Sequence, residues 1–403
     1  MKTKNKDKLS KRMLTAHSGI GLAVSLLMYI ICLTGTLAVF YPEFERWEQP
    51  GVPEFDQLSP QAMVQAKQAF SQRYPDSDKT LYIVLPTESL PRAHISDGDN
   101  EWWLDQDGSF AEPVKSDWTH LLTELHINLY LPKQLGLFIV GILGVMLTAL
   151  IISGVLSHTR IIKDAFRLRW GGTRQTQQID LHNRLSVWAL PFHFVIAVTG
   201  AFFGVVGLLI LVATTAFYGG DRQALIDDVY GGDPVITAHQ TPIDFAQAFK
   251  SLENTAPKAT PIYLMINKPN TDKQYLEIAA TLPGRLIYSE LYRFKANGKY
   301  INHQGFSDGS FSRQLIYSVY RIHFGHFGGY PVKLLYLVLG FAMTVICVTG
   351  FNIWLNKRGK RDWLNDSWFG FVWGTPIALA TAAIAGILTD GSEILAFILT
   401  LIV

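Results

Sequence analysis

Four long apolar blocks constrain the fold of this chain more than any other feature of its sequence. They cover residues 18–40, 134–157, 185–217 and 332–355. A helix needs roughly 20 apolar residues to cross a hydrocarbon core about 30 Å thick, and each block has that length. Such blocks exclude a soluble enzyme, a disordered chain and a small disulfide scaffold. The sequence therefore predicts a multi-pass membrane protein with a bundle of four core transmembrane helices.

The two ends of the chain need separate interpretation. The first block follows six Lys and Arg residues, as the apolar part of a signal peptide would, but it is longer, and no small-residue cleavage site follows Phe40. We interpret it as a retained helix. At the other end, residues 368–403 form a C-terminal hydrophobic segment made of one long and one short apolar stretch. This segment is either one span with an interfacial tail or a re-entrant hairpin.

Basic residues predict how the chain crosses the membrane. Lys and Arg are concentrated in the N-terminal tail (1–16) and in two loops, 159–181 and 357–367. Such segments stay in the cytoplasm, so we expect a bacterial inner-membrane protein with a cytoplasmic N-terminus. The hydrophilic segments 42–130 and 218–330 then lie in the periplasm. The transmembrane helices between these parts are expected at residues 17–41, 131–158, 182–217 and 331–356. The net charge is only +2, so nucleic acid is not an expected partner.

Each hydrophilic segment is predicted to form a small α+β domain. Ser59-Pro60 and Thr241-Pro242 are typical helix starts, with proline at the first helical position. Asp107-Gly108 and Asn297-Gly298 are turn sequences. Three strand-like runs stand between helix and turn in each segment: 81–85, 92–96 and 101–104 in the first, and 261–267, 274–280 and 287–294 in the second.

The membrane helices show an internal repeat. His17 and His182 each precede a glycine by 18 residues, which is five helical turns. His126 and His323 precede a glycine by 28 and 27 residues. The four glycines are Gly35, Gly200, Gly154 and Gly350. This pattern indicates a helix–domain–helix unit that occurs twice, with the small residues allowing close helix approach.

The repeated histidines are the candidate cofactor ligands. Zinc usually takes three or four protein ligands, and the sequence has neither an HExxH motif nor a cysteine cluster. Haem iron takes one or two axial ligands, and a helical bundle can supply two facing imidazoles. We therefore expect His17 with His182 to ligate a haem iron near the cytoplasmic face. His126 with His323 is expected to ligate one near the outer face.

Other histidines are weaker candidates. His326 is an alternative to His323, because it lies three residues further on the same expected helix face. His193 is a further candidate for the second haem, since it follows His182 by about three turns. His158 is interpreted as an interfacial residue first and a ligand second. His94, His239 and His303 are expected to be ordinary loop or surface residues.

Three pairs of sequence motifs resemble the PepSY-associated transmembrane-helix family, which includes inner-membrane ferric-siderophore reductases. They are Ala16-His17-Ser18-Gly19-Ile20-Gly21 with Leu33-Thr34-Gly35, Leu181-His182-Asn183-Arg184-Leu185 with Val198-Thr199-Gly200, and Ile322-His323-Phe324-Gly325 with Val348-Thr349-Gly350. The likeness covers about residues 10–357. It implies PepSY-like periplasmic domains, one or two b-type haems per chain, and electron transfer to ferric iron on the outer side.

The expected function is therefore that of a transmembrane ferric or ferric-chelate reductase. Its electron donor is expected to be a cytoplasmic flavin or nicotinamide system or a membrane quinol. No GxGxxG follows a strand in the sequence, so we expect the donor to bind elsewhere or to be a lipid-soluble quinol. Catalytic residues are not identifiable, and a homodimer remains open. Two other classes stay open: a membrane-anchored PepSY binding or regulatory protein, and a metal transporter. A transporter is less favoured because the apolar helices contain almost no Asp or Glu.

Overall fold

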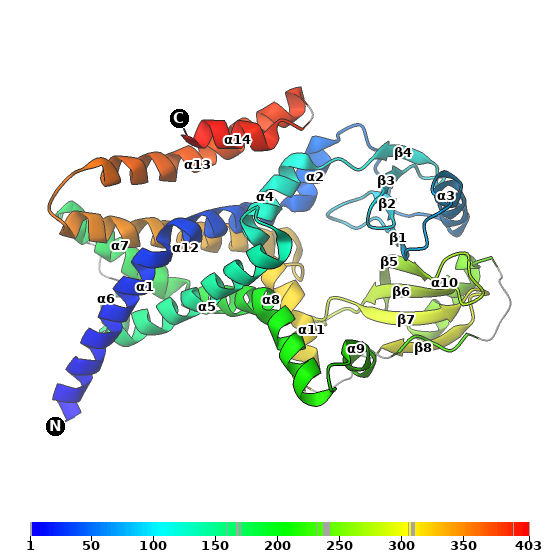
Figure 1. The fold of residues 1–403 in the computed structure, drawn as a ribbon, viewed down its shortest axis with the longest axis horizontal. Helices are drawn as coiled ribbons and strands as arrows, with labels where there is room; N and C mark the ends of the chain where they lie inside the picture. Colours follow the sequence, from blue (N-terminus) through cyan, green and yellow to red (C-terminus); the bar gives the residue numbers. More distant parts are fainter. Residues whose placement is uncertain are drawn as a thin grey trace. The chain divides into compact units, whose positions relative to one another are not determined.

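The chain folds into two compact units (Figure 1). The computed structural model describes residues 2–158, 160–166, 169, 171–230, 232–236, 242–304, 306–307, 311–389 and 391–402. The helical unit comprises Met1–Tyr41, Asp117–Ile210 and His323–Val403, and the sheet unit comprises Pro42–Ser116 and Leu211–Ile322. Each unit is described by itself below.

The helical unit is a bundle around α1. Within it, α1 packs against α4, α5 and α12, and α7 packs against α12. The helices are α1 (Lys2–Ala38), α4 (Asp117–Asn128), α5 (Lys133–Ser157), α6 (Ile161–Asp164), α7 (Arg174–Trp188), α8 (Leu190–Phe217), α11 (Phe311–Phe324), α12 (Gly329–Lys357), α13 (Trp363–Leu388) and α14 (Glu393–Ile402). Helices α8 and α11 continue into the sheet unit.

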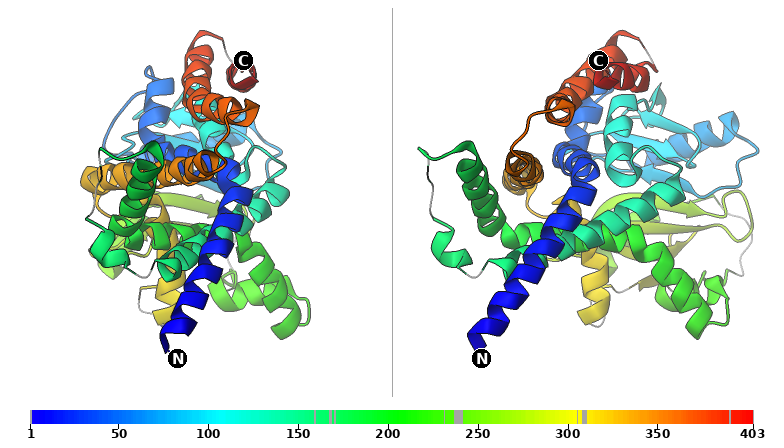
Figure 2. Two further views of the ribbon diagram at one scale, coloured as in Figure 1. Left: turned by 90° about the vertical axis from the view of Figure 1, so that its left-hand side faces the viewer. Right: turned by 60° about the vertical axis from the view of Figure 1, so that its left-hand side comes forward.

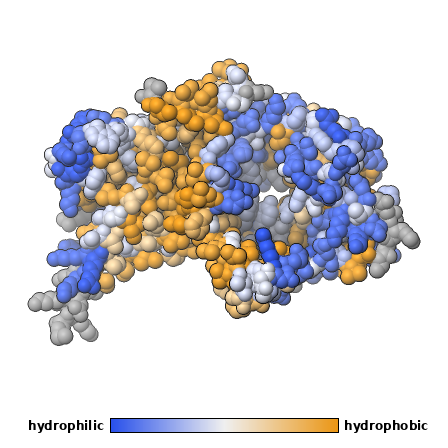
Figure 3. Space-filling model, viewed as in Figure 1, coloured by the Kyte–Doolittle hydropathy of each residue, from blue (hydrophilic) through white to orange (hydrophobic). Residues whose placement is uncertain are grey.

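Among the described residues, five helices have the length and composition of membrane spans. They are Lys8–Ala38 in α1, then α5, α8, α12 and α13. Their outer faces expose large apolar side chains such as Phe138, Val338 and Ile377, and Figure 3 shows an extensive apolar surface over the bundle. Such a surface suits contact with lipid chains. The predicted multi-pass membrane protein is confirmed.

The C-terminal segment consists of two helices, and the third predicted helix differs in detail from the expectation. Helix α13 alone has the length of a span, and α14 folds back along it (Figure 2). The helix predicted over 182–217 is two helices, because Ala189 leaves the helical conformation with φ −100° and ψ 13°. Pro191 has no backbone N–H, so it suits the first turn of the new helix α8. His182 therefore lies in the separate helix α7.

The sheet unit contains one antiparallel sheet of eight strands in the order β4-β3-β2-β1-β5-β6-β7-β8. The strands are β1 (Leu81–Val84), β2 (Ala93–Ser96), β3 (Glu101–Leu104), β4 (Phe110–Pro113), β5 (Thr260–Asn267), β6 (Tyr275–Thr281), β7 (Glu290–Lys295) and β8 (Tyr300–Gln304). The prediction of two separate small domains is corrected: β1 pairs with β5, from Leu81 opposite Ile266 to Val84 opposite Tyr263, and this joins both segments. The helices of the unit are α2 (Tyr41–Glu48), α3 (Pro60–Arg73), α9 (Arg222–Tyr230) and α10 (Phe245–Thr255).

Helices α3 and α10 and the sheet share one apolar core, in which Phe70 and Phe245 meet strand residues such as Ile83. The predicted start of α3 is confirmed, since the Ser59 hydroxyl accepts a hydrogen bond of 3.1 Å from the Ala62 backbone N–H. The predicted start of α10 is corrected. This helix begins three residues later, where the side chain of Asp244 accepts from the Gln247 N–H. Thr241 lies outside the described residues.

The six predicted strands are confirmed, with ends shifted by up to three residues. Two further strands, β4 and β8, were not predicted. Each forms a hairpin with the strand before it. The hairpin turns contain Gly108 and Gly298, whose φ values of +90° and +73° favour glycine. These turns were expected, but the strands that follow them were missed.

Candidate functional site

Two pairs of histidine rings lie close together inside the helical unit. His17 of α1 and His182 of α7 have ring centroids 6.2 Å apart and ring planes at 85°. His126 of α4 and His323 of α11 have centroids 6.1 Å apart and planes at 24°. We call these the first pair and the second pair. They unite the four histidines that the sequence singled out as axial ligands, although their role as ligands stays a prediction.

In the first pair, each ring is anchored through Nδ1 to a neighbouring helix. His17 Nδ1 lies 2.9 Å from the Leu150 carbonyl oxygen and 3.3 Å from the Ser153 hydroxyl. His182 Nδ1 lies 3.1 Å from the Ile346 carbonyl oxygen and 3.2 Å from the Thr349 hydroxyl. A carbonyl oxygen only accepts, so Nδ1 must carry the proton. In the neutral ring, Nε2 then keeps its lone pair.

The second pair is anchored in a related way. His126 Nδ1 donates to the Ile31 carbonyl oxygen at 2.9 Å. His323 Nδ1 lies 2.8 Å from the hydroxyl of Thr199. That hydroxyl donates its own proton to the Val195 carbonyl oxygen at 2.7 Å, so it accepts from His323. Within the described part of the chain, the Nε2 atoms of all four rings have no hydrogen-bond partner.

The four repeated glycines lie directly beneath the four rings. A Cβ atom on Gly154 would stand 3.2 Å from Cε1 of His17, and one on Gly350 would stand 3.3 Å from Cε1 of His182. The corresponding distances are 2.3 Å from Gly35 to His126 and 3.3 Å from Gly200 to His323. These glycines therefore make room for imidazole rings. Their interpretation as helix contacts is corrected.

Close backbone contact occurs at a different glycine pair. A Cβ on Gly141 of α5 would stand 2.7 Å from backbone atoms of Gly204 in α8. Sequence reasoning missed this contact, although small residues in two apolar helices are the usual signal for it.

Tight turns bring the second pair into the bundle. Between α4 and α5, Leu129 and Tyr130 have positive φ values of 57° and 56°. After α11, Gly325 has φ 71°. Positive φ at non-glycine residues is uncommon, and here it reverses the chain directly after the helix that carries His126. The chain therefore turns sharply directly after each of the two helices that carry His126 and His323.

Burial keeps the second pair neutral. His126 and His323 lie in α4 and α11, outside the five candidate spans. Burial lowers the pKa of His126, and burial together with the nearby His126 lowers the pKa of His323 to about 3. Both rings are therefore neutral near pH 7, which is the state in which imidazole binds a metal ion.

The weaker histidine candidates lie outside the two pairs. The Nε2 of His193 lies 3.2 Å from the Leu339 carbonyl oxygen and must donate to it, so its lone pair is not available there. His182 and His193 were expected about three turns apart in one helix, and this is corrected: the break at Ala189 places them in different helices. His326 follows the end of α11 at Phe324 and the turn at Gly325, so it does not share a helix face with His323. Its ring lies 5.9 Å from that of Tyr41.

The remaining histidines have separate environments. His158 follows the end of α5, and its buried Nδ1 has no hydrogen-bond partner among the described residues. His303 in β8 is exposed, as expected, and its Nδ1 lies 2.9 Å from the Tyr300 hydroxyl. His94 is not a surface residue, which corrects the expectation. Its Nε2 lies 3.0 Å from Oε1 of Glu101, and burial lowers its pKa to about 4. His239 lies outside the described residues.

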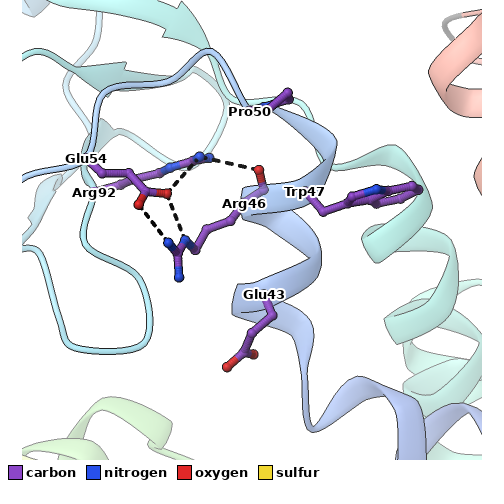
Figure 4. A pocket seen from close by; sticks show the side chains of 6 residues that line it. All are labelled: Glu43, Arg46, Trp47, Pro50, Glu54 and Arg92. Carbon is purple, nitrogen blue, oxygen red and sulfur yellow. Dashed lines mark hydrogen bonds and ion pairs between the residues drawn. The ribbon is translucent and has the colours of Figure 1, made fainter.

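The sheet unit has a cavity of about 420 Å³ beside α2. Figure 4 shows two guanidinium groups gathered around one carboxylate, while Trp47 points away from them. Arg46 donates hydrogen bonds of 2.8 and 2.7 Å to Glu54, and Arg92 donates one of 3.1 Å. Because these charges are paired within the protein, the cavity is a weaker candidate site than the histidine pairs. The cavity is lined by Glu43, Arg46, Trp47, Pro50, Glu54 and Arg92.

A buried carboxyl group lies on α2 close to this cavity. Burial and the neighbouring Glu101 and Glu48 raise the pKa of Glu45 to about 7, and Arg92 acts in the opposite direction. Metal binding by such groups has no support here: no group of three or more His, Cys, Asp or Glu within the described ranges could hold a metal ion. The two-imidazole pairs therefore remain the principal candidates.

Comparison with known proteins identifies the family. The chain is 25% identical over 253 residues to an uncharacterized protein of Pseudomonas aeruginosa, PA4219, and the match covers 60% of this chain. It spans 64% of that curated relative's length. The model of the PepSY-associated TM region matches residues 14–357, a range that includes all four paired histidines and ends with α12. The chain thus belongs to the PepSY-associated transmembrane family.

Proposed function

We propose that this protein is a haem-b-containing reductase of the bacterial inner membrane. In this proposal it passes electrons across the membrane to periplasmic ferric iron or a ferric siderophore, and the ferrous iron is released for uptake. One observation carries the proposal: two pairs of neighbouring imidazole rings, each ring with its Nδ1 anchored and its Nε2 without a hydrogen-bond partner in the described residues.

The spacing of the rings fits a metal ion held between two axial imidazoles. A metal–nitrogen bond is about 2 Å long and a ring centre lies about 1 Å beyond its nitrogen, so opposed rings have centroids about 6 Å apart. The observed distances are 6.2 Å and 6.1 Å. Since two protein ligands are too few for a usual zinc site, haem iron is the group that this ligand set fits best.

The chain's own residues would hold and tune the group. His17 and His182 would hold one haem, and His126 and His323 would hold the other. Hydrogen bonds from Nδ1 orient a ligand ring and increase its basicity. Bound haem supplies one-electron chemistry, because its iron alternates between the ferric and ferrous states.

A single helix spaces the two sites. Helix α1 carries His17 of the first pair and Gly35, which underlies His126 of the second pair. These positions are 18 residues apart, which corresponds to about 27 Å along a helix. That length is close to the thickness of the hydrocarbon core. The arrangement supports one redox site near each face of the membrane and hence an electron path across it.

The direction of transfer follows from the charge distribution. If the basic tail and loops are cytoplasmic, the first pair lies near the cytoplasmic face and the second near the periplasm. Electrons from a cytoplasmic or quinol donor would then enter at the first pair. Ferrous iron is held less tightly than ferric iron by hard oxygen ligands, so reduction would release it from a chelate.

The decisive experiment is the visible spectrum of the detergent-purified full-length protein, oxidised and dithionite-reduced, with a pyridine haemochrome count. We expect a low-spin b-type spectrum with two haems per chain. The reduced protein should then be reoxidised by a ferric chelate, with ferrous iron captured by a chromogenic chelator. Colourless protein from haem-replete cells would overturn the proposal and favour a regulatory protein or a metal transporter. Haem without reoxidation by ferric chelates would restrict the role to electron transfer.

A further inference from the structure

The protein's two cysteines meet in the middle of the helical unit. Cys32 lies in α1 and Cys347 in α12, 315 residues apart in the sequence, yet their Sγ atoms are 3.9 Å apart. Both thiols are free, and α1 packs directly against α12. Cys32 is buried, whereas Cys347 is partly exposed.

Their sequence context links them to both histidine pairs. Each cysteine begins the same four-residue pattern, Cys-x-Thr-Gly: Cys32-Leu33-Thr34-Gly35 and Cys347-Val348-Thr349-Gly350. The carbonyl group of Ile31, directly before Cys32, accepts the hydrogen bond of His126. The carbonyl group of Ile346, directly before Cys347, accepts that of His182. A change at the two sulfurs therefore acts on the backbone that holds one ring of each pair.

Three roles can be considered for the two cysteines: apolar packing, metal binding and disulfide formation. A single buried cysteine usually serves as a small apolar side chain. Here the two cysteines of the whole sequence are in contact, and a metal site would need further ligands that the described residues do not provide. Closure to a disulfide requires the sulfurs to approach to about 2.05 Å, a movement of less than about 2 Å from their present separation.

We propose that Cys32 and Cys347 form a peroxide-oxidisable dithiol that closes to a disulfide between α1 and α12. The more exposed Cys347 sulfur attacks one oxygen of hydrogen peroxide, the O–O bond breaks, and one water leaves with formation of a sulfenic acid. The Cys32 sulfur then attacks the sulfenic sulfur, the S–S bond forms, and the hydroxyl leaves with the Cys32 proton as a second water. An added dithiol reverses the closure by thiol–disulfide exchange and is itself oxidised to a disulfide.

The consequence for the histidine pairs rests on the proposed function. Drawing α1 toward α12 displaces the carbonyl groups of Ile31 and Ile346 relative to His126 and His182. Because these hydrogen bonds tune a ligand ring, closure of the disulfide would change the reduction potential of the bound haem at both sites. The dithiol would thus adjust the redox sites to the level of peroxide around the membrane.

The test uses the full-length protein in detergent, treated with hydrogen peroxide, freed of peroxide, and alkylated with a maleimide after denaturation. We expect both thiols to escape alkylation and the intact mass to fall by about 2 Da, the two hydrogens lost on forming an S–S bond. Digestion should yield a peptide pair joined through Cys32 and Cys347, and dithiothreitol should restore both thiols. The matched control is Cys32→Ser, in which Cys347 has no partner thiol and its peptide should gain oxygen in steps of about 16 Da instead. In Cys347→Ser the buried Cys32 thiol should stay reduced and alkylatable.

A second readout follows the haem. The midpoint potential of the wild-type protein should shift on closure and return after dithiothreitol, while the same treatment leaves the potential of Cys32→Ser unchanged. Thiols that remain alkylatable while added glutathione is oxidised would overturn the proposal. A link between two chains, or sulfinic acids without a link, would also overturn it. If the protein is colourless but closes the disulfide, the proposed function fails and the thiol chemistry stands. If it is red but its thiols stay reduced, the thiol proposal alone fails.

Discussion

The paired histidines of the helical unit and His94 of the sheet unit illustrate two different uses of the same side chain. His17, His126 and His182 donate Nδ1–H to backbone carbonyl groups, and their Nε2 atoms have no hydrogen-bond partner in the described residues. His94 instead has its Nε2 3.0 Å from the carboxylate of Glu101. A ring held by a carboxylate through one nitrogen is a member of an internal polar network. A ring anchored by neutral oxygens opposite a second ring is arranged as a ligand.

The two pairs also differ from one another. In the first pair each Nδ1 is near both a carbonyl oxygen and a hydroxyl, whereas in the second pair each has one acceptor. The glycine under His126 leaves the least room for a side chain, 2.3 Å against 3.2 to 3.3 Å at the other three. The second pair therefore depends more strongly on single residues, and substitutions can test this contrast.

The largest effect is expected from removing a ring of either pair. His17→Ala and His182→Ala should each lower the haem content of the purified protein from two to one per chain, with the same residual spectrum. His126→Ala and His323→Ala should also retain one haem per chain, and their spectra should match each other but differ from those of the first two variants. This follows if each pair holds one iron between two rings.

The matched control is His120→Ala, since His120 is exposed on the same helix α4 as His126. It should keep full haem content and an unchanged spectrum. The assignment of the pairs is wrong if any of the four ring variants behaves like this control.

The next largest effect is expected at the glycine under His126. In Gly35→Ala, the new methyl group would lie 2.3 Å from the ring and must displace it. Overpacking of this kind costs about 1–3 kcal/mol, which corresponds to about a 5- to 150-fold loss in haem affinity at the second pair. Haem transfer to apomyoglobin measures this loss.

Gly19→Ala is the control, because it lies on the same helix α1 and a Cβ there would meet nothing within 4 Å. In Gly200→Ala the new Cβ would lie 3.3 Å from Cε1 of His323, so its loss of haem affinity should be intermediate between those of Gly35→Ala and Gly19→Ala. Equal haem loss from Gly35→Ala and Gly200→Ala would refute the claim that the second pair depends on Gly35 in particular.

A smaller effect is expected at the hydroxyl acceptors. Thr199→Val removes the acceptor of His323 Nδ1, whereas Thr349→Val leaves His182 with its carbonyl acceptor. A net hydrogen bond contributes about 0.5–1.5 kcal/mol, so Thr199→Val should weaken haem binding by up to about 10-fold and shift the potential of the second site. Thr349→Val should cause a smaller change in redox titrations of the first site. The reverse order would contradict the proposed anchoring.

The local features of this fold could be predicted from sequence, but the long-range contacts could not. Apolar block length predicts the spans, and Ser59-Pro60 predicts the start of α3. The glycine role was misjudged because His126 meets Gly35 across 91 residues of sequence, a contact that spacing along one helix does not reveal. The sequence pattern nonetheless grouped the histidines that the structure brings together, because both members of each pair occupy matching positions in the predicted repeat.

The sheet illustrates the same limit. The turn at Asn297-Gly298 indicates a hairpin, so the strand β8 was predictable from local signals. The pairing of β1 with β5 was not, because it depends on two edges from distant segments meeting in register. The position of Pro191 is a local signal for the helix break at Ala189. Only the structure shows that this break places His182 and His193 in different helices.

The smallest effect is expected in the sheet unit, where titration should affect stability and leave the haem unchanged. Glu45 has a pKa of about 7 in the folded chain against an ordinary value of 4.5. Between these values the folded chain holds a proton that the unfolded chain has released, so the free energy of unfolding falls as pH rises through this window. Glu45→Gln should therefore gain stability relative to wild type as pH rises from 4.5 to 7, by on the order of 1–3 kcal/mol.

His94 provides the opposite case for the same measurement, thermal unfolding followed from pH 4.5 to 7.5. Its pKa of about 4 lies below the ordinary value of 6.5, so between these values the unfolded chain holds the extra proton. The free energy of unfolding of the wild-type protein should then fall as the pH falls. His94→Gln should therefore become more stable relative to wild type as the pH falls. Two variants with opposite pH trends and unchanged haem spectra would establish the sheet unit as an electrostatic network separate from the redox sites. If either variant alters the haem spectrum, the claim that the sheet unit is separate from the histidine pairs is wrong.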